Sequence, residues 1–440
     1  VVERLTKIGL EVENIRSSND DLDNFIICKI VKSQKHPNAD KLKLCDVNVG
    51  EINLVKVVCG AQNARDGLFT VYAPPGTFIP KTKMKLKIAK IRGIESHGML
   101  CSGYELDQSS DKEGIIELNK KEKNIGDKYF KNIGEKIMDI SITPNRPDCL
   151  SIIGTAYEVA AVTNQIVKYP DVSYKEDDSS EEIFASTSVV VDDHSLCLRY
   201  TGTLVRNIHV QTSPDWLRNR LEKSGVRPIN NVVDITNYVM WEYGQPLHAF
   251  DYERLLKHHV IIRKGYTGEE IITLDGVQRG LFQDTLVIAD DRDAIALAGI
   301  IGGKNSEIVG TTRDVFLESA SFDPENNRKT SHSFDLRTEA SIRFEKGLRP
   351  DLVEVALKRA TQLIRDIAGG VVAKGKIDEY PGREKPRKIM LTARKMKQVL
   401  GIEISQANIE KTLNGLGFQC CVTDGAVDVR IPYWRSDIAI

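Results

Sequence analysis

The chain has 440 residues, of which 41% are hydrophobic and 28% are charged, and its formal net charge is −1. This length indicates roughly two to four domains, and the composition is that of a soluble globular protein. No run of about 18 apolar residues is present that could cross a membrane. The near-zero charge of the whole chain gives no sign of nucleic-acid binding.

The 8 cysteines form no C-x-x-C pair. This argues against a zinc site and a disulfide framework, so we expect a reducing cytoplasm. The sequence begins without a methionine or a secretory signal and ends in the apolar stretch PYWRSDIAI. We therefore expect a segment of a longer protein, with further domains after Ile440.

Residues 29–92 are basic, with 13 Lys or Arg against 4 Asp or Glu. The runs FIICKIV and KLCDVNV are rich in strand-forming residues and are separated by the turn-forming HPNAD. Further short strands with Gly and Pro turns follow. Five such strands predict a small barrel of the OB-fold type.

A row of lysines lies in 81-KTKMKLKIAK-90. We expect a strand here, whose period of two places four ammonium groups on one face. One interpretation is edge-strand protection against aggregation. The other is a groove that follows phosphates, with these tRNA-binding candidates: Lys81, Lys83, Lys85 and Lys87.

The stretch 143-TPNRPDCLSIIGTAYEVAAVT-163 predicts a helix capped by Asp148, and the polar residues 170–184 predict a linker. Residues 189–380 mix strands (VVVDD, VIIRK, DTLVIAD, VFLES) with helices, one of which follows Pro350 and ends at Gly369.

Residues 388–440 predict two helices, capped by Thr392 and Ser405, and then a hairpin made of FQCCV and AVDVRIP. This order is compatible with nucleic-acid binding, but it is more often a structural or protein-contact module.

The phosphate-loop, dinucleotide, zinc-protease and serine-hydrolase motifs are absent. The candidates are instead polar residues in apolar surroundings. Taken alone, His248 after the Gly-Gln-Pro turn is a hydrogen-bonded core histidine or a site residue. Glu318 in VFLESASF is at least half buried, so it needs a partner or marks a site. Ala298-Gly299 forms a tight turn or lets backbone amides approach a ligand.

Several segments, taken together, resemble the beta subunit of bacterial phenylalanyl-tRNA synthetase, and the resemblance runs over essentially the whole chain. They are LTKIGLEVE, HPNADKLKLCDVNVG with VCGAQN, IRGIESHGMLCS, ITPNRPDCLS, RPINNVVDITNYV with GQPLHAFD, LAGIIGG and RTEASIRFEKG.

The resemblance implies an α+β multidomain chain. An OB-fold tRNA-binding barrel at 22–133 would interrupt an N-terminal α+β domain at 1–21 and 134–185. A mixed α/β editing domain would follow at 190–380, and a truncated, winged-helix-like domain of the B5 type, with helices and a hairpin, at 384–440.

The implied function is binding of tRNA(Phe) and hydrolysis of mischarged Tyr-tRNA(Phe). The alpha subunit would carry ATP-dependent phenylalanylation in an α2β2 tetramer. The alternatives are a non-catalytic tRNA-binding scaffold subunit and a free-standing tRNA-binding protein.

There is a physical reason for an editing site. An apolar pocket for Phe rejects Tyr, which has one added hydroxyl, by only about 10²-fold, so a second site must hydrolyse the wrong ester. The resemblance makes Glu318 the acceptor that recognises this hydroxyl. It places four residues at the wall near the ester, where His248 would orient water or polarise the ester: His248, Thr236, Asn237 and Pro246. The substrate-binding residues would be Ala298, Gly299, Thr338 and Ala340, which leave room for the ring, and Arg227 at the edge.

The last motif, 433-YWRSDI-438, also resembles the corresponding motif of this family. Asp437 corresponds to the first of several carboxylates that hold Mg²⁺ at the alpha–beta interface. A hard cation needs several oxygen ligands, and the companions of Asp437 would lie beyond Ile440. We therefore do not expect Asp437 alone to bind the ion.

Overall fold

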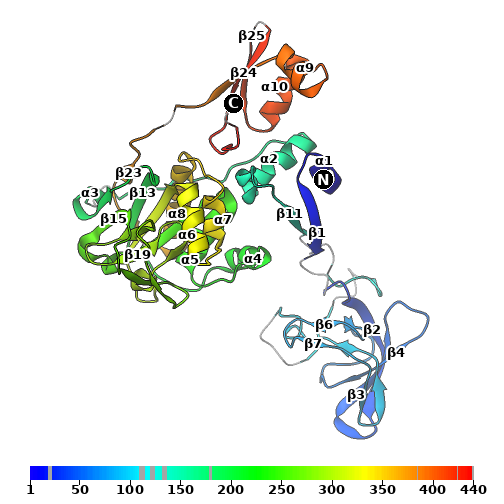
Figure 1. The fold of residues 1–440 in the computed structure, drawn as a ribbon. Helices are drawn as coiled ribbons and strands as arrows, with labels where there is room; N and C mark the ends of the chain where they lie inside the picture. The colour runs from blue at the N-terminus through cyan, green and yellow to red at the C-terminus, as the bar shows by residue number, and fades with distance from the viewer. Residues whose placement is uncertain are drawn as a thin grey trace. The chain divides into compact units, whose positions relative to one another are not determined.

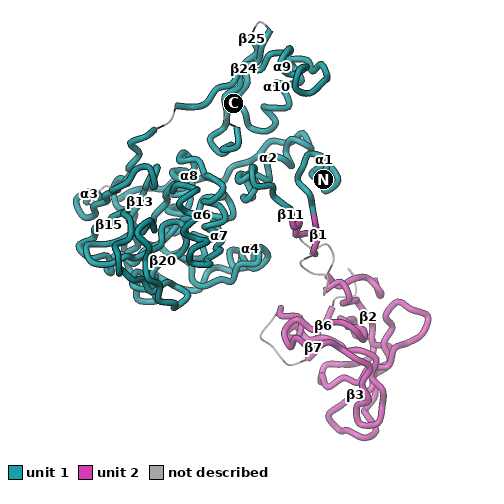
Figure 2. Tube along the Cα trace, in the orientation of Figure 1, with its two compact units in different colours: residues 1–12, 140–440 teal, residues 13–139 magenta. Residues whose placement is uncertain are grey.

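The computed structural model describes residues 1–17, 22–108, 114–118, 124–130, 136–177, 181–383, 385–423 and 425–438. The fold is α+β throughout (Figure 1). The chain divides into two compact units, one made of residues 1–12 with 140–440 and the other of residues 13–139 (Figure 2). Among the described residues, no helix is long and apolar enough to cross a membrane.

The smaller unit contains an antiparallel five-stranded sheet in the order β10-β5-β2-β3-β4. The predicted strands FIICKIV and KLCDVNV are confirmed, and the chain turns between them at Pro37-Asn38. The sheet strands are β2 (Ile26–His36), β3 (Ala39–Asn48), β4 (Val55–Cys59), β5 (Phe69–Ala73) and β10 (Met99–Leu100).

The ends of this sheet, β10 and β4, are not joined by any strand pairing among the described residues. The strand number matches the prediction, but the closed barrel is not confirmed. Strand number alone does not decide closure, which also requires a matching tilt and stagger of the strands.

The predicted strand over residues 81–90 is wrong. The only strands there are β7 (Met84–Lys85), paired with β6 (Phe78–Ile79), and β8 (Ala89–Ile91), paired with β9 (Ile94–Ser96). Lys83 has a φ of +52°, which interrupts the strand. Of the apolar residues that alternate with lysine, Leu86 is buried whereas Met84 and Ile88 are exposed. Burial of one face of a strand is what fixes the alternation of its side chains. Because only one apolar residue of this stretch is buried, nothing holds it in a continuous strand.

Helix α1 (Val2–Lys7) belongs to the larger unit. Strand β1 (Glu11–Ser17), which pairs with β11 (Lys136–Ser141), lies mostly in the smaller unit. The 3₁₀ helix η1 (Pro147–Leu150) then leads into α2 (Ile152–Thr163). Asp148 does not cap α2 as predicted, because Asp148 lies inside the preceding 3₁₀ helix η1. Ser151 is the cap, and its hydroxyl accepts a hydrogen bond from the Gly154 amide at 2.9 Å.

Two sheets form the core of residues 188–379. The first has the antiparallel order β14-β21-β13-β22, with β23 also paired to β13, and the second has the order β12-β15-β18-β19-β20. The four strands predicted by sequence are confirmed as β12, β15, β18 and β21. The strands are β12 (Ser188–Val191), β13 (Cys197–Arg206), β14 (Leu247–Asp251), β15 (His259–Lys264), β18 (Leu286–Ala289), β19 (Ala294–Leu297), β20 (Ile301–Gly302), β21 (Val315–Phe322), β22 (Val371–Val372) and β23 (Ile377–Glu379).

Helices α5 (Asn231–Tyr243) and α8 (Leu352–Ala368) pack against the first sheet. The apolar stripe and the end of α8 at Gly369 are confirmed. The hydroxyls of Thr203 on β13 and Thr361 on α8 are hydrogen-bonded at 2.7 Å. Shorter elements complete this region: α3 (Ile183–Ser186), α4 (Asp215–Lys223), α6 (Pro324–Ser333), α7 (Glu339–Phe344), β16 (Glu270–Ile272), β17 (Gln278–Gly280) and the 3₁₀ helices η2 (Tyr252–Arg254), η3 (Leu256–His258) and η4 (Lys304–Ser306).

The C-terminal segment has a three-stranded sheet, β24-β26-β25, with two helices. The predicted caps are confirmed, since Thr392 accepts from the Lys395 amide and Ser405 from the Asn408 amide. The predicted hairpin is confirmed as β25 with β26; its turn residue Asp424 lies outside the described residues. The elements are β24 (Lys388–Thr392), α9 (Ala393–Leu400), α10 (Gln406–Gly415), β25 (Gln419–Thr423) and β26 (Ala426–Arg430).

Candidate active site

The turn between α5 and β14 places the histidine that the sequence analysis selected. Asn230 begins α5 by accepting hydrogen bonds from the amides of Val232 and Val233. Gly244 ends the helix with a φ of +83°, a left-handed conformation that glycine adopts without strain. The buried Pro246 then leads into β14, which carries His248.

His248 and Glu318 are direct neighbours on adjacent antiparallel strands, because they are register partners between β14 and β21. Every residue of β21 is buried, and Glu318 is 5% exposed. Directly opposite residues share one face of a sheet, so the two side chains lie side by side. The structure thus brings together the two residues that the sequence analysis weighed separately.

A tyrosine that the sequence analysis missed completes this cluster. The hydroxyl of Tyr200 on β13 donates a hydrogen bond to Oε2 of Glu318 at 3.0 Å. Tyr200 is fully buried. Its only signal in the sequence was an aromatic residue inside the strand CLRYTGTLV, a pattern that also suits ordinary core packing.

Burial sets the protonation of this cluster. It raises the pKa of the Glu318 carboxyl to about 8, against a smaller opposite effect of the hydrogen bond from Tyr200. Burial also lowers the pKa of the His248 imidazole to about 4. Near pH 7 the carboxyl therefore mostly keeps its proton and the imidazole is neutral, whereas the sequence analysis gave Glu318 only the role of an acceptor.

The imidazole of His248 is half buried and makes no hydrogen bond to any other residue that the structure describes. It contacts the edge of the Phe250 ring, with ring centroids 4.5 Å apart. A Cβ at Gly302 on β20 would collide with the imidazole, so the backbone of β20 lies directly against it. A core histidine is normally hydrogen-bonded. Because the His248 imidazole is not, both of its ring nitrogens remain available for a ligand or water.

The Ala298–Gly299 turn is held against α6 and α7. Asn327 donates to the Ala298 carbonyl at 3.3 Å, and Thr338 donates to the Ile300 carbonyl at 2.9 Å. Thr338 also caps α7 by accepting from the Ser341 amide. Gly299 has a φ of +69°, and a Cβ there would lie 2.6 Å from Nδ2 of Asn327. The turn therefore requires glycine and brings Ala298, Gly299 and Thr338 into one place.

The remaining predicted site residues are more scattered. Ala340 is half buried and packs against the same apolar core as Ala298. Thr236 donates its hydroxyl to the Val233 carbonyl of its own helix, and Asn237 is half buried beside it. Arg227 is exposed before α5. Among the described residues, no hydrogen bond or ion pair joins Thr236, Asn237 or Arg227 to His248 or Glu318.

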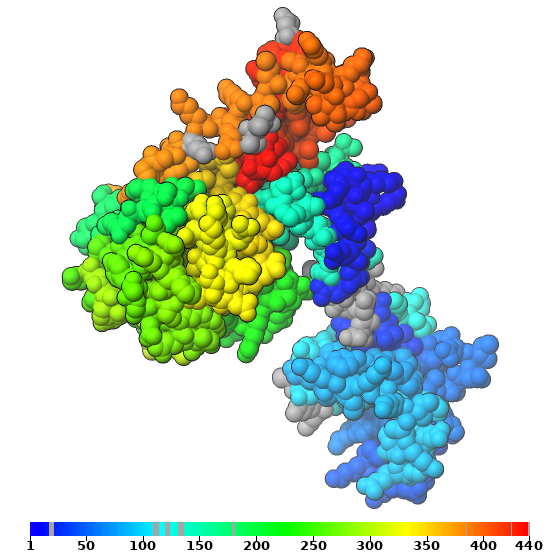
Figure 3. Space-filling model, in the orientation of Figure 1, coloured from blue at the N-terminus to red at the C-terminus, as the bar shows by residue number. Residues whose placement is uncertain are grey.

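Two cavities of the described residues lie away from His248 and Glu318. One is lined by Pro147, Tyr243 and Trp434, and the other, of about 400 Å³, by Arg349, Arg430 and Trp434. On the face drawn in Figure 3, residues 190–370 (green to yellow) form a continuous surface. The chemistry of His248 and Glu318, and not a cavity, therefore marks this site.

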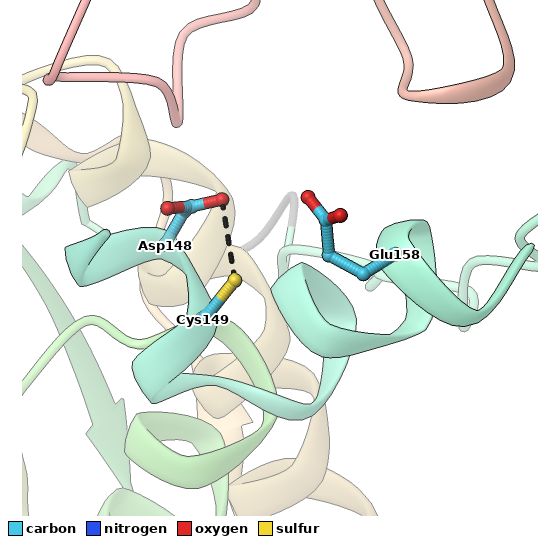
Figure 4. Close-up of side chains that lie close together, drawn as sticks. All are labelled: Asp148, Cys149 and Glu158. Carbon is cyan, nitrogen blue, oxygen red and sulfur yellow. Dashed lines mark hydrogen bonds between the residues drawn. The ribbon is translucent and has the colours of Figure 1, made fainter. Parts of the chain in front are cut away.

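A second cluster of buried acids lies in residues 146–158. Asp148 and Cys149 come from η1 and Glu158 from α2 (Figure 4), and their ligand atoms lie within 4.8 Å of one another. Arg146 donates to Asp148 at 2.8 Å and to Glu158 at 2.5 Å. Burial raises the pKa of the Cys149 thiol. The guanidinium already supplies the positive charge, so this cluster is a salt bridge rather than a metal site.

Asp437 does not provide an open metal ligand. Both of its oxygens accept hydrogen bonds from Arg435, at 2.7 and 2.8 Å. These bonds lower the pKa of Asp437, although burial opposes them. The described residues around Asp437 do not make up the several oxygen ligands that Mg²⁺ requires.

Three family models match the chain: a putative tRNA binding domain over residues 25–128, a B3/4 domain over 196–369 and a tRNA synthetase B5 domain over 389–440. His248, Glu318 and Tyr200 all lie in the B3/4 match. Domains of this kind define the class as a chain of an aminoacyl-tRNA synthetase.

Three relatives are similar to the chain over nearly its whole length. The chain is 42% identical to the phenylalanine–tRNA ligase beta subunit of Syntrophotalea carbinolica, over 99% of this chain and 54% of that protein. It is 42% identical to that of Fusobacterium nucleatum, over 100% and 55%, and 43% identical to that of Geobacter sulfurreducens, over 99% and 54%. Over nearly its whole length the chain is similar to phenylalanine–tRNA ligase beta subunits, and it spans about half the length of these relatives.

Among solved structures, an N-terminal fragment of the phenylalanyl-tRNA synthetase beta-subunit from Pyrococcus horikoshii aligns over 70% of this chain and 85% of that chain. The identity is 13% and the TM-score is 0.37, which is too low to carry a structural argument.

Proposed function

We propose that this chain is part of a phenylalanyl-tRNA synthetase beta subunit that binds tRNA(Phe) and hydrolyses mischarged Tyr-tRNA(Phe). The observation that carries the proposal is the neutral His248, without a hydrogen bond to another described residue, beside the buried carboxyl of Glu318. The alpha subunit would carry ATP-dependent phenylalanylation, in an α2β2 tetramer located in the cytoplasm.

Glu318 would recognise the hydroxyl that distinguishes Tyr from Phe. A protonated carboxyl offers both a donor and an acceptor, so it can exchange a hydrogen bond with a phenol. A phenylalanyl ring would leave this buried polar group without that partner, at a cost of about 1–3 kcal/mol. Binding to a site that reads a hydroxyl in this way therefore favours the wrong ester over the correct one.

His248 would orient the attacking water or polarise the ester carbonyl. The nucleophile–base–acid arrangement of a covalent hydrolase is not present around His248 among the described residues, so the proposed reaction uses positioned water. Thr236, Asn237 and Pro246 would form the wall near the ester, with Arg227 at its edge. Ala298, Gly299, Thr338 and Ala340 would leave room for the tyrosyl ring.

The smaller unit would bind tRNA as an OB-type module, with the exposed lysines 81, 83, 85 and 87 facing phosphates. The match to a putative tRNA binding domain supports this. The proposed domains are 1–21 with 134–185, 22–133, 190–380 and 384–440, the last being winged-helix-like. Asp437 would join a Mg²⁺ site only with carboxylates supplied by the longer chain, after releasing Arg435.

The test is tyrosine release from Tyr-tRNA(Phe) by the full-length beta subunit with its alpha subunit, compared with Phe-tRNA(Phe). We expect release to prefer the tyrosyl ester. In Glu318→Ala we expect the preference to fall by at least about tenfold, because the polar partner is lost. In His248→Ala we expect release to fall about 10²-fold or more, with the fold intact.

The rival function is a non-catalytic tRNA-binding scaffold. It would be favoured if the wild-type complex binds tRNA(Phe) but releases no tyrosine, and if Glu318→Ala changes neither release nor misacylation. Exposed Glu325→Ala is a matched control, because its carboxylate pairs with Lys329 on the surface of α6.

A further inference from the structure

We propose that Tyr200 is a positioning residue for Glu318, and that its hydroxyl sets how well the site distinguishes a tyrosyl from a phenylalanyl ester. This inference rests on the editing function proposed above. It assigns a role to a residue that the sequence analysis did not select.

The sheet register explains why Tyr200 reaches Glu318. Glu318 lies directly opposite Gly202 on β13, and Tyr200 lies opposite Ala320. Because side chains alternate along a strand, Tyr200 is on the same face as Glu318 and is its diagonal neighbour. A long aromatic side chain spans this diagonal, and the hydroxyl meets Oε2 at 3.0 Å.

The hydrogen bond restricts the carboxyl of Glu318. One oxygen accepts from Tyr200, and the other, Oε1, accepts no hydrogen bond from another described residue. A carboxyl held at one oxygen can rotate less about its last side-chain bond, because rotation would break the bond. Oε1 is therefore presented in a fixed direction, as recognition of a single hydroxyl requires.

Among the described residues, no charged group beside Glu318 could fix its carboxyl instead of Tyr200. The titratable groups next to Glu318 are Tyr200 and Cys197 on β13 and His248 on β14. Burial raises the pKa of the Cys197 thiol, and Tyr200 also keeps its proton because burial raises its pKa. His248 is neutral, so among the described residues only Tyr200 donates a hydrogen bond to the carboxyl.

The variant Tyr200→Phe removes the hydroxyl and keeps the ring. Tyr252→Phe is a matched control, because Tyr252 is also buried in this domain and its hydroxyl donates to the Ser186 carbonyl at 2.6 Å. Tyr200→Phe loses one buried hydrogen bond, and Tyr252→Phe loses two, because the Tyr252 hydroxyl is also hydrogen-bonded to the Thr187 hydroxyl at 2.9 Å. A general loss of stability therefore affects the control at least as much. Only the first removes a contact to Glu318.

The experiment measures kcat and KM for hydrolysis of Tyr-tRNA(Phe) and Phe-tRNA(Phe) by the full-length complex. For Tyr200→Phe we expect the Tyr/Phe ratio of kcat/KM to fall about tenfold, mainly through a higher KM for the tyrosyl ester. Tyr252→Phe should leave the ratio unchanged. An unchanged ratio in Tyr200→Phe, or equal losses for both esters, would overturn the positioning role.

A second measurement separates this inference from the editing function. Carbon-13 NMR of the labelled Glu318 carboxyl, identified with Glu318→Gln, follows its titration in each variant. The hydrogen bond from Tyr200 lowers the pKa of Glu318, so Tyr200→Phe should raise it and Tyr252→Phe should not. If the wild type releases no tyrosine, the editing proposal fails. An unshifted titration would overturn the positioning role whether or not editing is observed.

Discussion

Two clusters of buried carboxyl groups in the larger unit differ in what compensates them. Asp148 and Glu158 share the guanidinium of Arg146, and each is hydrogen-bonded to it. Glu318 has no cation beside it among the described residues, and its one protein partner is the neutral hydroxyl of Tyr200. The first cluster is compensated by a cation, whereas the second avoids a buried charge by keeping its proton.

This difference separates a structural cluster from a reactive one. A compensated set of charges has its hydrogen bonds already satisfied and offers nothing to a ligand. A neutral carboxyl with one oxygen uncommitted, next to a neutral imidazole, can still exchange hydrogen bonds with a substrate. Burial of an acid is therefore not by itself a sign of function. The neighbouring groups determine whether the acid is paired or can still bind a ligand.

The largest effect is expected from a variant that removes the cation of the compensated cluster, Arg146. Arg146→Met leaves two buried carboxylates without their cation, so we expect a loss of about 3–5 kcal/mol in the free energy of unfolding. Urea unfolding monitored by circular dichroism measures it. Arg65→Met, which removes an exposed pair with Glu117, is the control and should cost far less, because an exposed ion pair contributes little to stability. Equal costs for the two variants would contradict the distinction.

A smaller effect tests the uncompensated acid. Between its ordinary value near 4.5 and the folded pKa of about 8, Glu318 is ionised in the unfolded chain but protonated in the folded one. The unfolded state then binds fewer protons, so stability falls as pH rises, by up to about 1.4 kcal/mol per pH unit. Glu318→Gln should reduce this slope.

The window from pH 6.5 to 8 isolates Glu318, because His248, with its pKa lowered to about 4, changes stability only below its ordinary value of 6.5. Urea unfolding at both ends of the window, for wild type and Glu318→Gln, gives the slope. Glu325→Gln, an exposed acid whose pKa is lowered by Lys329, should behave as wild type. Identical slopes in all three proteins would show that Glu318 is ionised when folded.

The smallest effect concerns the exposed lysines of the smaller unit, where charges are solvated. Replacing Lys81, Lys83, Lys85 and Lys87 with Gln should weaken tRNA binding and reduce the slope of log K against log salt by about 2–3. Lys81 contributes least, because it pairs with Asp107 at 2.6 Å. The control replaces exposed lysines of the C-terminal segment, Lys388, Lys395 and Lys411. A salt slope unchanged in the first variant would favour the edge-protection interpretation.

Local sequence signals predicted the elements whose ends are set by neighbouring residues. Thr392 and Ser405 cap their helices, and α8 ends before Gly369, as the sequence indicates. These predictions succeed because a cap depends on a side chain and an amide two or three residues away. The prediction that Asp148 caps α2 was wrong, because Ser151, three residues further on, is the cap of that helix.

The sequence by itself determined that this chain is α+β, which family it resembles and that His248 and Glu318 are unusual polar residues in apolar strands. Only the tertiary structure decided that they are neighbours, since strand register between β14 and β21 joins residues 70 positions apart. It also decided that Tyr200 donates to Glu318 and that no cation does so among the described residues. Burial and register depend on the whole sheet, and no local pattern contains them.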